Sequence, residues 1–292
     1  YLHSVGFGNT EAAVSGALDE LRSLPEELPL YQKRIQRFFE LILDIDKAGR
    51  EPSRQVMRYY HFDQPDQPSD PELFPFRLLT NDGNRPRERK CSFVTEAGIR
   101  VTPEEVISCS HALKGVMREL GLTGQDLFIM GDPVPPGGYI RDAGMNPVTD
   151  PAKISGCSAI FAAGGRYEWR ECFLAVFNEL ARNPGKPFVV ANPDSYYPVP
   201  EGGYGIGAGS QARYIIQLLS EIGIRKEPVY LGKPYRAIFD YAFEDIRNAY
   251  RLPQPLRPGR VLMLGDFLKS DIAGANAMGM TGGLMMTGVT TE

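Results

Sequence analysis

The sequence predicts an α/β fold built on a parallel sheet. Three observations support this prediction. Short apolar runs alternate with helix-like stretches, a pattern typical of parallel strands joined by crossover helices. Polar or glycine-containing turns follow several of these runs, as expected where strands end. The chain has 292 residues, 42% of them hydrophobic, which is enough for one large domain or two ordinary ones.

The candidate strands are short apolar runs bounded by turn residues. They cover residues 76–79, 127–130, 158–162, 188–191, 229–231 and 261–264. The candidate helices cover residues 10–23, 103–120, 168–183, 210–222, 236–250 and 271–278. Thr102, with Glu105 three residues later, predicts the start of the second helix, which would contain His111. Pro and Gly cluster at 133–138, 193–209 and 252–259, where we expect long loops or linkers.

Charge and composition favour a small molecule as the partner. The 32 basic and 36 acidic side chains leave a formal charge of −4, so no broad cationic surface for nucleic acid or anionic lipid is predicted. No apolar run approaches the ~20 residues of a membrane helix. We therefore expect no nucleic acid and no membrane as partners. The expected location is the cytoplasm. An organellar location stays an alternative because the sequence starts at Tyr1 and not at Met.

An acidic turn follows the last predicted strand, in the stretch VLMLGDFLKSDI at residues 261–272. Ligands of open α/β sheets bind beyond the carboxyl ends of the strands, where Asp266 is expected. A carboxylate there suits Mg²⁺, which prefers oxygen ligands. Asp271, at the start of the next helix, could brace this neighbour. The alternative is that both aspartates only cap a turn.

Two other strand ends carry polar groups. Lys233 follows the run at 229–231, and a fixed ammonium there could neutralise a phosphate or a nucleophilic carboxylate. Thr80 and Asn81 follow the run at 76–79, and a hydroxyl with turn amides suits phosphoryl oxygens. The alternatives are a solvated surface lysine and a plain turn.

The order of these turns resembles the haloacid dehalogenase superfamily, in particular its phosphatases with a large α/β cap, the nitrophenylphosphatase-like group. The pattern is strand-TN, a long insertion, strand-GKP and strand-GDxxxxDI, and it covers roughly residues 70–292. VVANPD at 189–194 also matches that group. The resemblance implies a Rossmann-like three-layer core at 1–108 and 201–292, a C2-type cap inserted at 109–200, and a homodimer formed through the cap. It also implies that Asn192 and Asp194 bind substrate.

Such an enzyme needs a first motif with two aspartates, and the candidate is LILDIDKAGRE at 41–51. In an extended segment, Asp44 and Asp46 point to the same side. One carboxylate could then attack phosphorus while the other moves the proton. The following Lys47-Ala48-Gly49-Arg50 departs from the family pattern. A helical reading stays open because apolar residues from Ile35 to Ile45 recur with gaps of three and four, and it would leave Asp44 on a helix surface.

The resemblance implies a Mg²⁺-dependent phosphomonoester hydrolase that acts on a small phosphorylated molecule through an aspartyl phosphate. Its implied roles are Asp44 as nucleophile and Asp46 as acid and base. Thr80, Asn81 and Lys233 would contact the phosphoryl group. Asp266 would hold Mg²⁺ together with Asp44 and Asp46, and Asp271 would support the loop. The alternative is an inactive relative that keeps the scaffold for binding or assembly.

Overall fold

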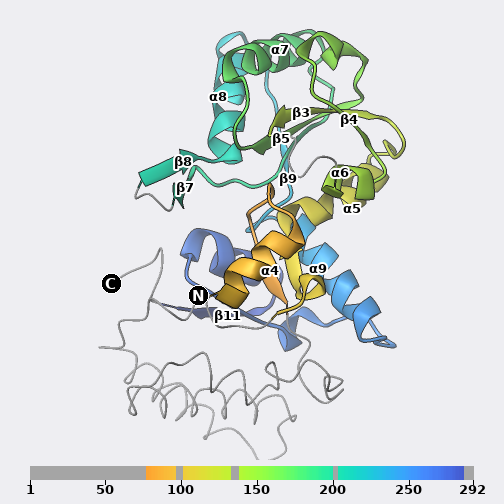
Figure 1. Cartoon of the computed structure of the whole chain (residues 1–292), viewed down its shortest axis with the longest axis vertical. Helices are drawn as coiled ribbons and strands as arrows, with labels where there is room; N and C mark the ends of the chain where they lie inside the picture. Colours follow the sequence, from red (N-terminus) through yellow and green to blue (C-terminus); the bar gives the residue numbers. More distant parts are fainter. Residues whose placement is uncertain (1–76, 97–100, 133–137, 200–202, 286–292) are drawn as a thin grey trace, which may run out of the picture.

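A computed structural model describes residues 77–96, 101–132, 138–199 and 203–285. Asp44, Asp46 and the predicted helix at 10–23 lie outside these residues. Figure 1 shows the described elements in two groups along the longest axis of the molecule. None of the helices in the described ranges is long and apolar enough to cross a membrane.

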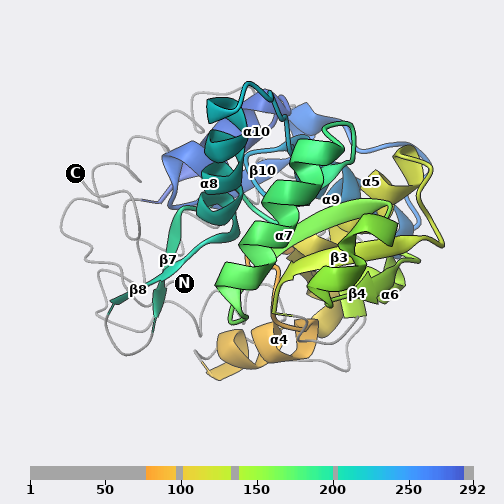
Figure 2. The ribbon, with the colours of Figure 1, turned by 90° about the horizontal axis from the view of Figure 1, so that it is seen from above.

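The upper group is built on a five-stranded parallel sheet. Its strands, in spatial order, are β4 (Asn146–Val148), β3 (Asp126–Gly131), β5 (Ala159–Gly164), β6 (Phe188–Val190) and β9 (Val229–Tyr230). Helices α7 (Trp169–Arg182) and α8 (Ala208–Glu221) cover one face, as Figures 1 and 2 show. Helices α5 (Leu113–Glu119) and α6 (Gly138–Asp142) lie between the sheet and the lower group. The apolar core runs through the central strands, where Phe128, Ile160 and Val189 are fully buried.

The lower group contains two parallel strand pairs. They are β1 (Leu78–Thr80) with β2 (Val106–Ser108), and β10 (Leu262–Gly265) with β11 (Thr281–Leu284). The helices are α4 (Arg87–Glu96), α9 (Arg236–Ala249) and α10 (Ala273–Ala277), with a π-helical turn at Leu268–Ile272 leading into the last. Short 3₁₀ turns lie at Pro103–Glu105, Cys109–Ala112 and Pro258–Arg260, and another, at Pro151–Gly156, connects β4 to β5 in the upper group.

The predicted strands and the α/β class are confirmed. All six predicted positions carry strands, shifted by no more than two residues at either end. The cap at Thr102 is present as well, because its N–H donates to the Glu105 carboxylate at 2.8 Å. The five-stranded sheet takes β9 from beyond residue 200, whereas the predicted boundary of the inserted unit lies at that residue.

The prediction of one helix over 103–120 was wrong. The segment forms a 3₁₀ turn, then strand β2, then a second 3₁₀ turn that holds His111, and the α-helix begins only at Leu113. Val106 and Ile107 are fully or almost fully buried and pair with β1, so tertiary contacts override the helical spacing. A strand of three residues is too short to show a periodicity of its own.

The predicted loop at 193–209 also contains regular structure. Strands β7 (Tyr196–Val199) and β8 (Gly203–Ile206) form an antiparallel hairpin, and α8 begins at Ala208. Tyr196 and Tyr204 stack edge to face across the hairpin, with ring centroids 5.1 Å apart. Such cross-strand aromatic pairs stabilise a hairpin that Pro and Gly conceal in the sequence.

Candidate active site at the strand ends

The side chain of Asn81 joins three segments just beyond β1. Its amide nitrogen donates to the Lys233 carbonyl oxygen at 3.0 Å and to the Asp194 carboxylate at 3.1 Å. Its amide oxygen accepts from the Lys233 N–H at 2.8 Å. A Cβ on Gly232 would lie 2.6 Å from that oxygen, so only glycine permits this approach. Asn81 therefore fixes the backbone from which the Lys233 side chain extends.

Lys233 is a buried cation with a defined position. Its ammonium donates to the Leu79 carbonyl oxygen at 2.9 Å and forms an ion pair with Asp271 at 2.6 Å. The two side chains of this pair are 10% and 7% exposed. A buried pair with such geometry retains much more of its attraction than a surface pair. The alternative reading of Lys233 as a solvated surface residue is therefore wrong.

Asp271 is held against the strand end that precedes Asp266. Its second carboxylate oxygen accepts from the Phe267 N–H at 3.1 Å. A Cβ on Gly265 would lie only 2.3 Å from the Asp271 carboxyl carbon, so the carboxylate packs directly over Gly265. Asp266 follows immediately and is 9% exposed. The acidic turn is thus a folded, buried structure that connects Asp266 to Lys233 through Asp271.

Asn192 and Asp194 follow β6 and face the same loop. The Asn192 amide donates to the Asn81 carbonyl oxygen at 2.7 Å, and its oxygen accepts from the Asp194 N–H at 3.1 Å. Burial raises the pKa of Asp194 above its ordinary value, although the hydrogen bond from Asn81 and the charge of Lys233 favour the carboxylate. The nearby Asp271 charge acts in the same direction as burial.

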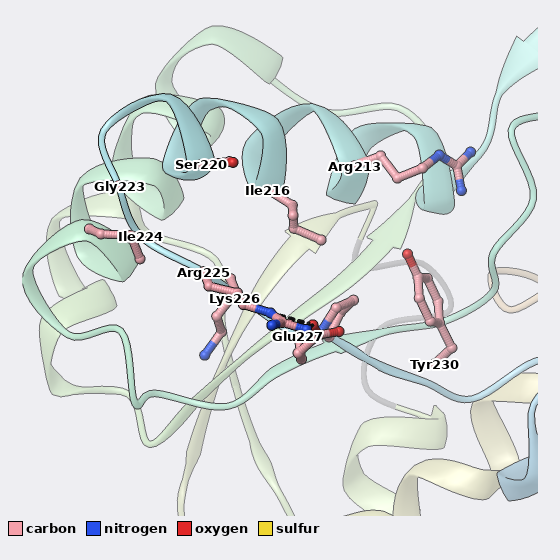
Figure 3. A pocket seen from close by; sticks show the side chains of 10 residues that line it. Arg213, Ile216, Ser220, Gly223, Ile224, Arg225, Lys226, Glu227 and Tyr230 are labelled. Atoms are coloured by element: carbon pink, nitrogen blue, oxygen red, sulfur yellow. Dashed lines mark hydrogen bonds and ion pairs between the residues drawn. The ribbon is translucent and has the colours of Figure 1, made fainter.

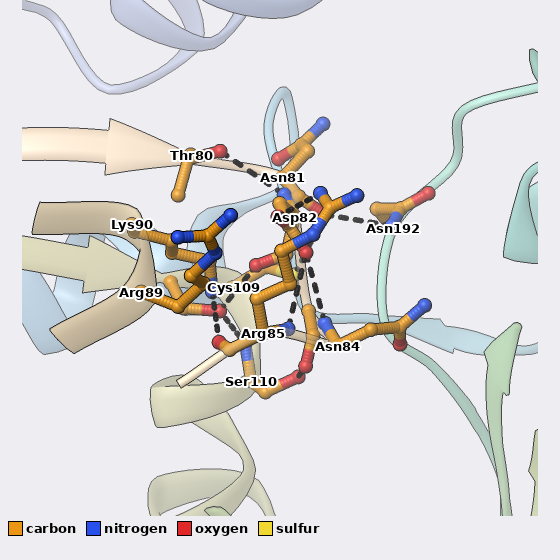
Figure 4. Close-up of polar contacts among 12 residues, drawn as sticks. Thr80, Asn81, Asp82, Asn84, Arg85, Arg89, Lys90, Cys109, Ser110 and Asn192 are labelled. Atoms are coloured by element: carbon orange, nitrogen blue, oxygen red, sulfur yellow. Dashed lines mark hydrogen bonds and ion pairs between the residues drawn. The ribbon is translucent and has the colours of Figure 1, made fainter. Parts of the chain in front are cut away.

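The loop after β1 is held by side chains at several of its carbonyl groups (Figure 4). Ser108 donates to the Asp82 carbonyl oxygen at 2.7 Å, and Ser110 donates to that of Gly83 at 3.0 Å. Thr80 accepts from the Asp82 N–H at 3.1 Å, which leaves its own hydroxyl proton available for a ligand. These hydrogen bonds hold the loop backbone at the sheet edge.

The structure brings together the predicted residues that it describes. Contacts connect Asn81, Asn192, Asp194, Lys233 and Asp271, and Thr80 and Asp266 adjoin this group in the chain. Asp44 and Asp46 lie outside the described residues. Within the described ranges, no three His, Cys, Asp or Glu side chains form a metal-binding cluster. Asp266 offers an oxygen of the kind that Mg²⁺ prefers, but a complete ligand set needs further residues.

A separate cavity of about 620 Å³ lies between α8 and β9 (Figure 3). Its cationic side chains are already engaged: Arg225 pairs with Glu227 at 2.9 Å, and Lys226 donates to the carbonyl oxygens of Pro184 and Lys186. Arg213 donates to the Pro193 carbonyl oxygen at 2.9 Å. The chemistry of the strand ends, and not this depression, therefore identifies the candidate active site.

Several residues that shape the site had no recognisable signal in the sequence. They are Ser108, Cys109 and Ser110, which bind the loop backbone. Short polar residues of this kind also occur in ordinary turns, and only the pairing of β1 with β2 places 108–110 beside the loop. The position of Asp82, two residues before Asn84 whose N–H it accepts, was the one local clue.

Parts of this chain are similar in sequence to known proteins. Residues 230–292 match a family model described as HAD-hydrolase-like. Chronophin from Bos taurus is 29% identical over 155 residues, which are 52% of this chain and 48% of that protein. Glycerol-3-phosphate phosphatase from Gallus gallus is 34% identical over 113 residues, 38% of this chain and 32% of that protein. The matches thus span about half or less of these relatives.

Solved structures show the same fold. A p-nitrophenyl phosphatase from Archaeoglobus fulgidus superimposes with a TM-score of 0.59 and 23% identity, over 74% of this chain and 75% of that chain. A glycerol phosphate phosphatase from Mycobacterium tuberculosis, in complex with magnesium, gives 0.59 and 22% over 74% and 59%. The predicted resemblance to the nitrophenylphosphatase-like group of the haloacid dehalogenase superfamily is confirmed, as is the Rossmann-like α/β fold class.

Proposed function

We propose that this haloacid dehalogenase-like chain is a phosphatase that hydrolyses a small phosphate monoester. The observation that carries the proposal is the fixed ammonium of Lys233, held between the Leu79 carbonyl oxygen and Asp271 at 2.9 and 2.6 Å. Thr80 ends β1, and Asp266 directly follows β10. Strand ends of this kind form the ligand-binding edge of a parallel sheet.

The charges at this edge favour a divalent cation as cofactor. Asp194, Asp266 and Asp271 would repel a phosphate dianion, and Lys233 is already balanced by Asp271. Asp266 would hold Mg²⁺ together with Asp44 and Asp46, and the bound ion would offset charge on the phosphoryl oxygens. The oxygen-rich donor set fits that ion, and the described residues supply part of it.

Asp44 is the proposed nucleophile. Among the described residues, β1 and β10 each pair with only one strand. Lys233 contacts both the end of β1 and the turn after β10, so the two pairs share one edge. An additional strand beside them that ends at Asp44 would bring its carboxylate to that edge. This is the catalytic reading of residues 41–44, in preference to the helical one.

The chemistry then follows in two displacements. An Asp44 carboxylate oxygen attacks phosphorus in line and forms an aspartyl phosphate, while Asp46 gives a proton to the departing ester oxygen. Asp46 next takes a proton from water, which attacks phosphorus and restores Asp44. The Thr80 hydroxyl and the Lys233 ammonium bind the transferring oxygens throughout. Asp271 holds the ammonium in place.

The inserted unit supplies closure and selectivity in this proposal. The five-stranded sheet includes β9, so we place the return of the chain to the core after Tyr230 and not at residue 200. Asn81 and Asn192 have their amide groups engaged with the chain itself, which assigns them a positioning role. Asp194, which Asn81 holds at this edge, is proposed to contact the ester group. A homodimer through the inserted unit remains part of the proposal.

Hydrolysis of p-nitrophenyl phosphate, with Mg²⁺ and with EDTA, tests the function. Magnesium-dependent turnover that Asp44→Asn abolishes is the expected result. Removal of a covalent nucleophile ordinarily lowers kcat by several orders of magnitude, roughly 10⁴-fold or more. Asp142→Asn, at an exposed position of α6, is the matched control. Turnover that survives Asp44→Asn would remove Asp44 from the mechanism. Absence of turnover on any phosphate ester would favour a binding or assembly protein.

A further inference from the structure

One carbonyl group of the loop after β1 receives two hydrogen bonds from side chains of two different helices. The Arg85 carbonyl oxygen accepts from the Lys90 ammonium at 2.6 Å and from the Tyr139 hydroxyl at 2.8 Å. The ammonium and the hydroxyl are themselves 3.1 Å apart, so the three groups close a triangle. Figure 4 shows Lys90 and Arg85 at this end of the loop. Donation by a charged group makes the first of these bonds a strong one.

Lys90 is buried without a counter-ion. It is 6% exposed, and within the described part of the chain it forms no ion pair. Burial lowers the pKa of its ammonium, and the charge of Asp82 only partly opposes this effect. A buried unpaired charge destabilises the folded state, so its position calls for a specific role. Its nearest partners are the Arg85 carbonyl oxygen and the Tyr139 hydroxyl and ring.

The triangle connects the two groups of elements. Lys90 belongs to α4 in the lower group, whereas Tyr139 belongs to α6 beside the five-stranded sheet. His111 packs edge to face on the Tyr139 ring, with centroids 4.6 Å apart, and stacks on Tyr241 of α9 at 5.3 Å. These rings fix the direction of the Tyr139 hydroxyl. The carbonyl group of Arg85 is therefore held from both units.

We infer that Lys90 and Tyr139 form a clamp that positions the phosphoryl-binding loop and couples it to the inserted unit. The loop begins with Thr80 and Asn81 at the proposed site and ends at the clamped Arg85. Within the loop, Asp82 accepts from the N–H groups of Asn84 and Arg85 at 3.0 and 3.3 Å, so movement at one end is transmitted to the other. Neither clamp residue contacts substrate; both are positioning residues. The inference rests on the proposed phosphatase function.

Kinetics of the full-length protein on p-nitrophenyl phosphate with Mg²⁺ test the clamp. Lys90→Met and Tyr139→Phe should each raise KM, and the inhibition constant of inorganic phosphate, about fivefold, the equivalent of one ordinary hydrogen bond. These constants do not depend on the fraction of folded enzyme, so a loss of stability alone would not move them. The double variant should be no worse than the more affected single variant, because both act through one carbonyl group. Lys114→Met and Tyr214→Phe are matched controls at exposed positions and should change neither constant.

Amide hydrogen exchange gives a readout that does not require activity. The clamp variants should exchange the amides of residues 81–85 faster than the controls do. The clamp would be overturned if its variants changed neither the amide exchange of residues 81–85 nor the two kinetic constants. Additive effects on these constants in the double variant would overturn it as well. A wild-type protein without turnover would overturn the phosphatase proposal instead, and exchange would then decide whether the clamp holds the loop. Tyr139→Phe, which deletes one oxygen atom, keeps the test valid if Lys90→Met does not fold.

Discussion

His111 makes the stability of this protein depend on pH between 7 and 5. The half-buried ring lies among donors: the Arg87 Nε–H donates to its Nε2 at 2.6 Å, and the Ser108 N–H points to its Nδ1 at 2.8 Å. Burial, with the charges of Arg87 and Lys90, lowers the pKa of His111 to about 3, although the Ser108 carbonyl group favours the protonated ring. A second proton on this ring is therefore disfavoured in the folded protein.

The sign and size of the effect follow from linkage. In the unfolded chain His111 titrates near pH ~6.5, so at lower pH the unfolded state binds a proton that the folded state does not. The stability from the neutral ring is fully present above pH ~6.5 and is lost as the pH falls from there toward the folded pKa of about 3. Between pH 7 and 5 the loss from this one group is about 2 kcal/mol.

Urea unfolding of the wild type and of His111→Gln at pH 7, 6 and 5 measures this loss. Gln keeps a side-chain oxygen for Arg87 but has no group that titrates in this range. The unfolding free energy of the wild type should fall more steeply toward pH 5, so that the difference between the two proteins shrinks by about 2 kcal/mol. A difference that stays constant from pH 7 to 5 would show that His111 titrates alike in both states, which would refute the burial argument.

Two further substitutions test the strand ends. Lys233→Met leaves the buried Asp271 without its cation, so the unfolding free energy, measured by urea titration, should fall by about 3–5 kcal/mol. We also expect the variant to lose phosphatase turnover. Retained turnover would contradict the role of the ammonium. Gly265→Ala would place a Cβ 2.3 Å from the Asp271 carboxyl carbon, so we expect both activity and thermal stability to fall. Gly259→Ala is the control, because the atom nearest to its Cβ would be 4.0 Å away, and it should change neither.

The sequence was sufficient to predict which polar residues lie at or just beyond the ends of the strands. Thr80, Lys233 and Asp266 each follow an apolar run, and parallel strands bring their carboxyl ends to one edge. This rule needs no knowledge of side-chain contacts. It does not predict that Asn81 binds the Lys233 backbone, since the two residues are 152 positions apart and nothing local indicates their pairing.

The features that the sequence did not predict have a common physical origin. Val106 and Ile107 have a spacing compatible with a helix, and only the neighbouring β1 makes them a strand. Lys90 is 49 positions from Tyr139, and nothing local indicates its burial, because lysine side chains are usually solvated. In both cases the decisive interaction is tertiary, and it contradicts the local preference. The first motif at 41–51 poses the same problem, since strand and helix are locally almost equivalent there.

The balance of charge explains why the loop and the acidic turn must be held so firmly. The Lys233–Asp271 pair is neutral as a unit, so on the proposed function the ammonium alone does not offset the charge of a phosphate ester. A phosphate dianion can bind there only if donors and a cation are already in place, because side chains that must reorganise would lose much of the gain. Three sets of contacts hold these groups in place: Asn81 binds the Lys233 backbone, Asp271 packs over Gly265, and the clamp holds the Arg85 carbonyl group. Each acts on the backbone at or near a site residue, so the rigidity of the edge is a condition for binding an anion beside carboxylates.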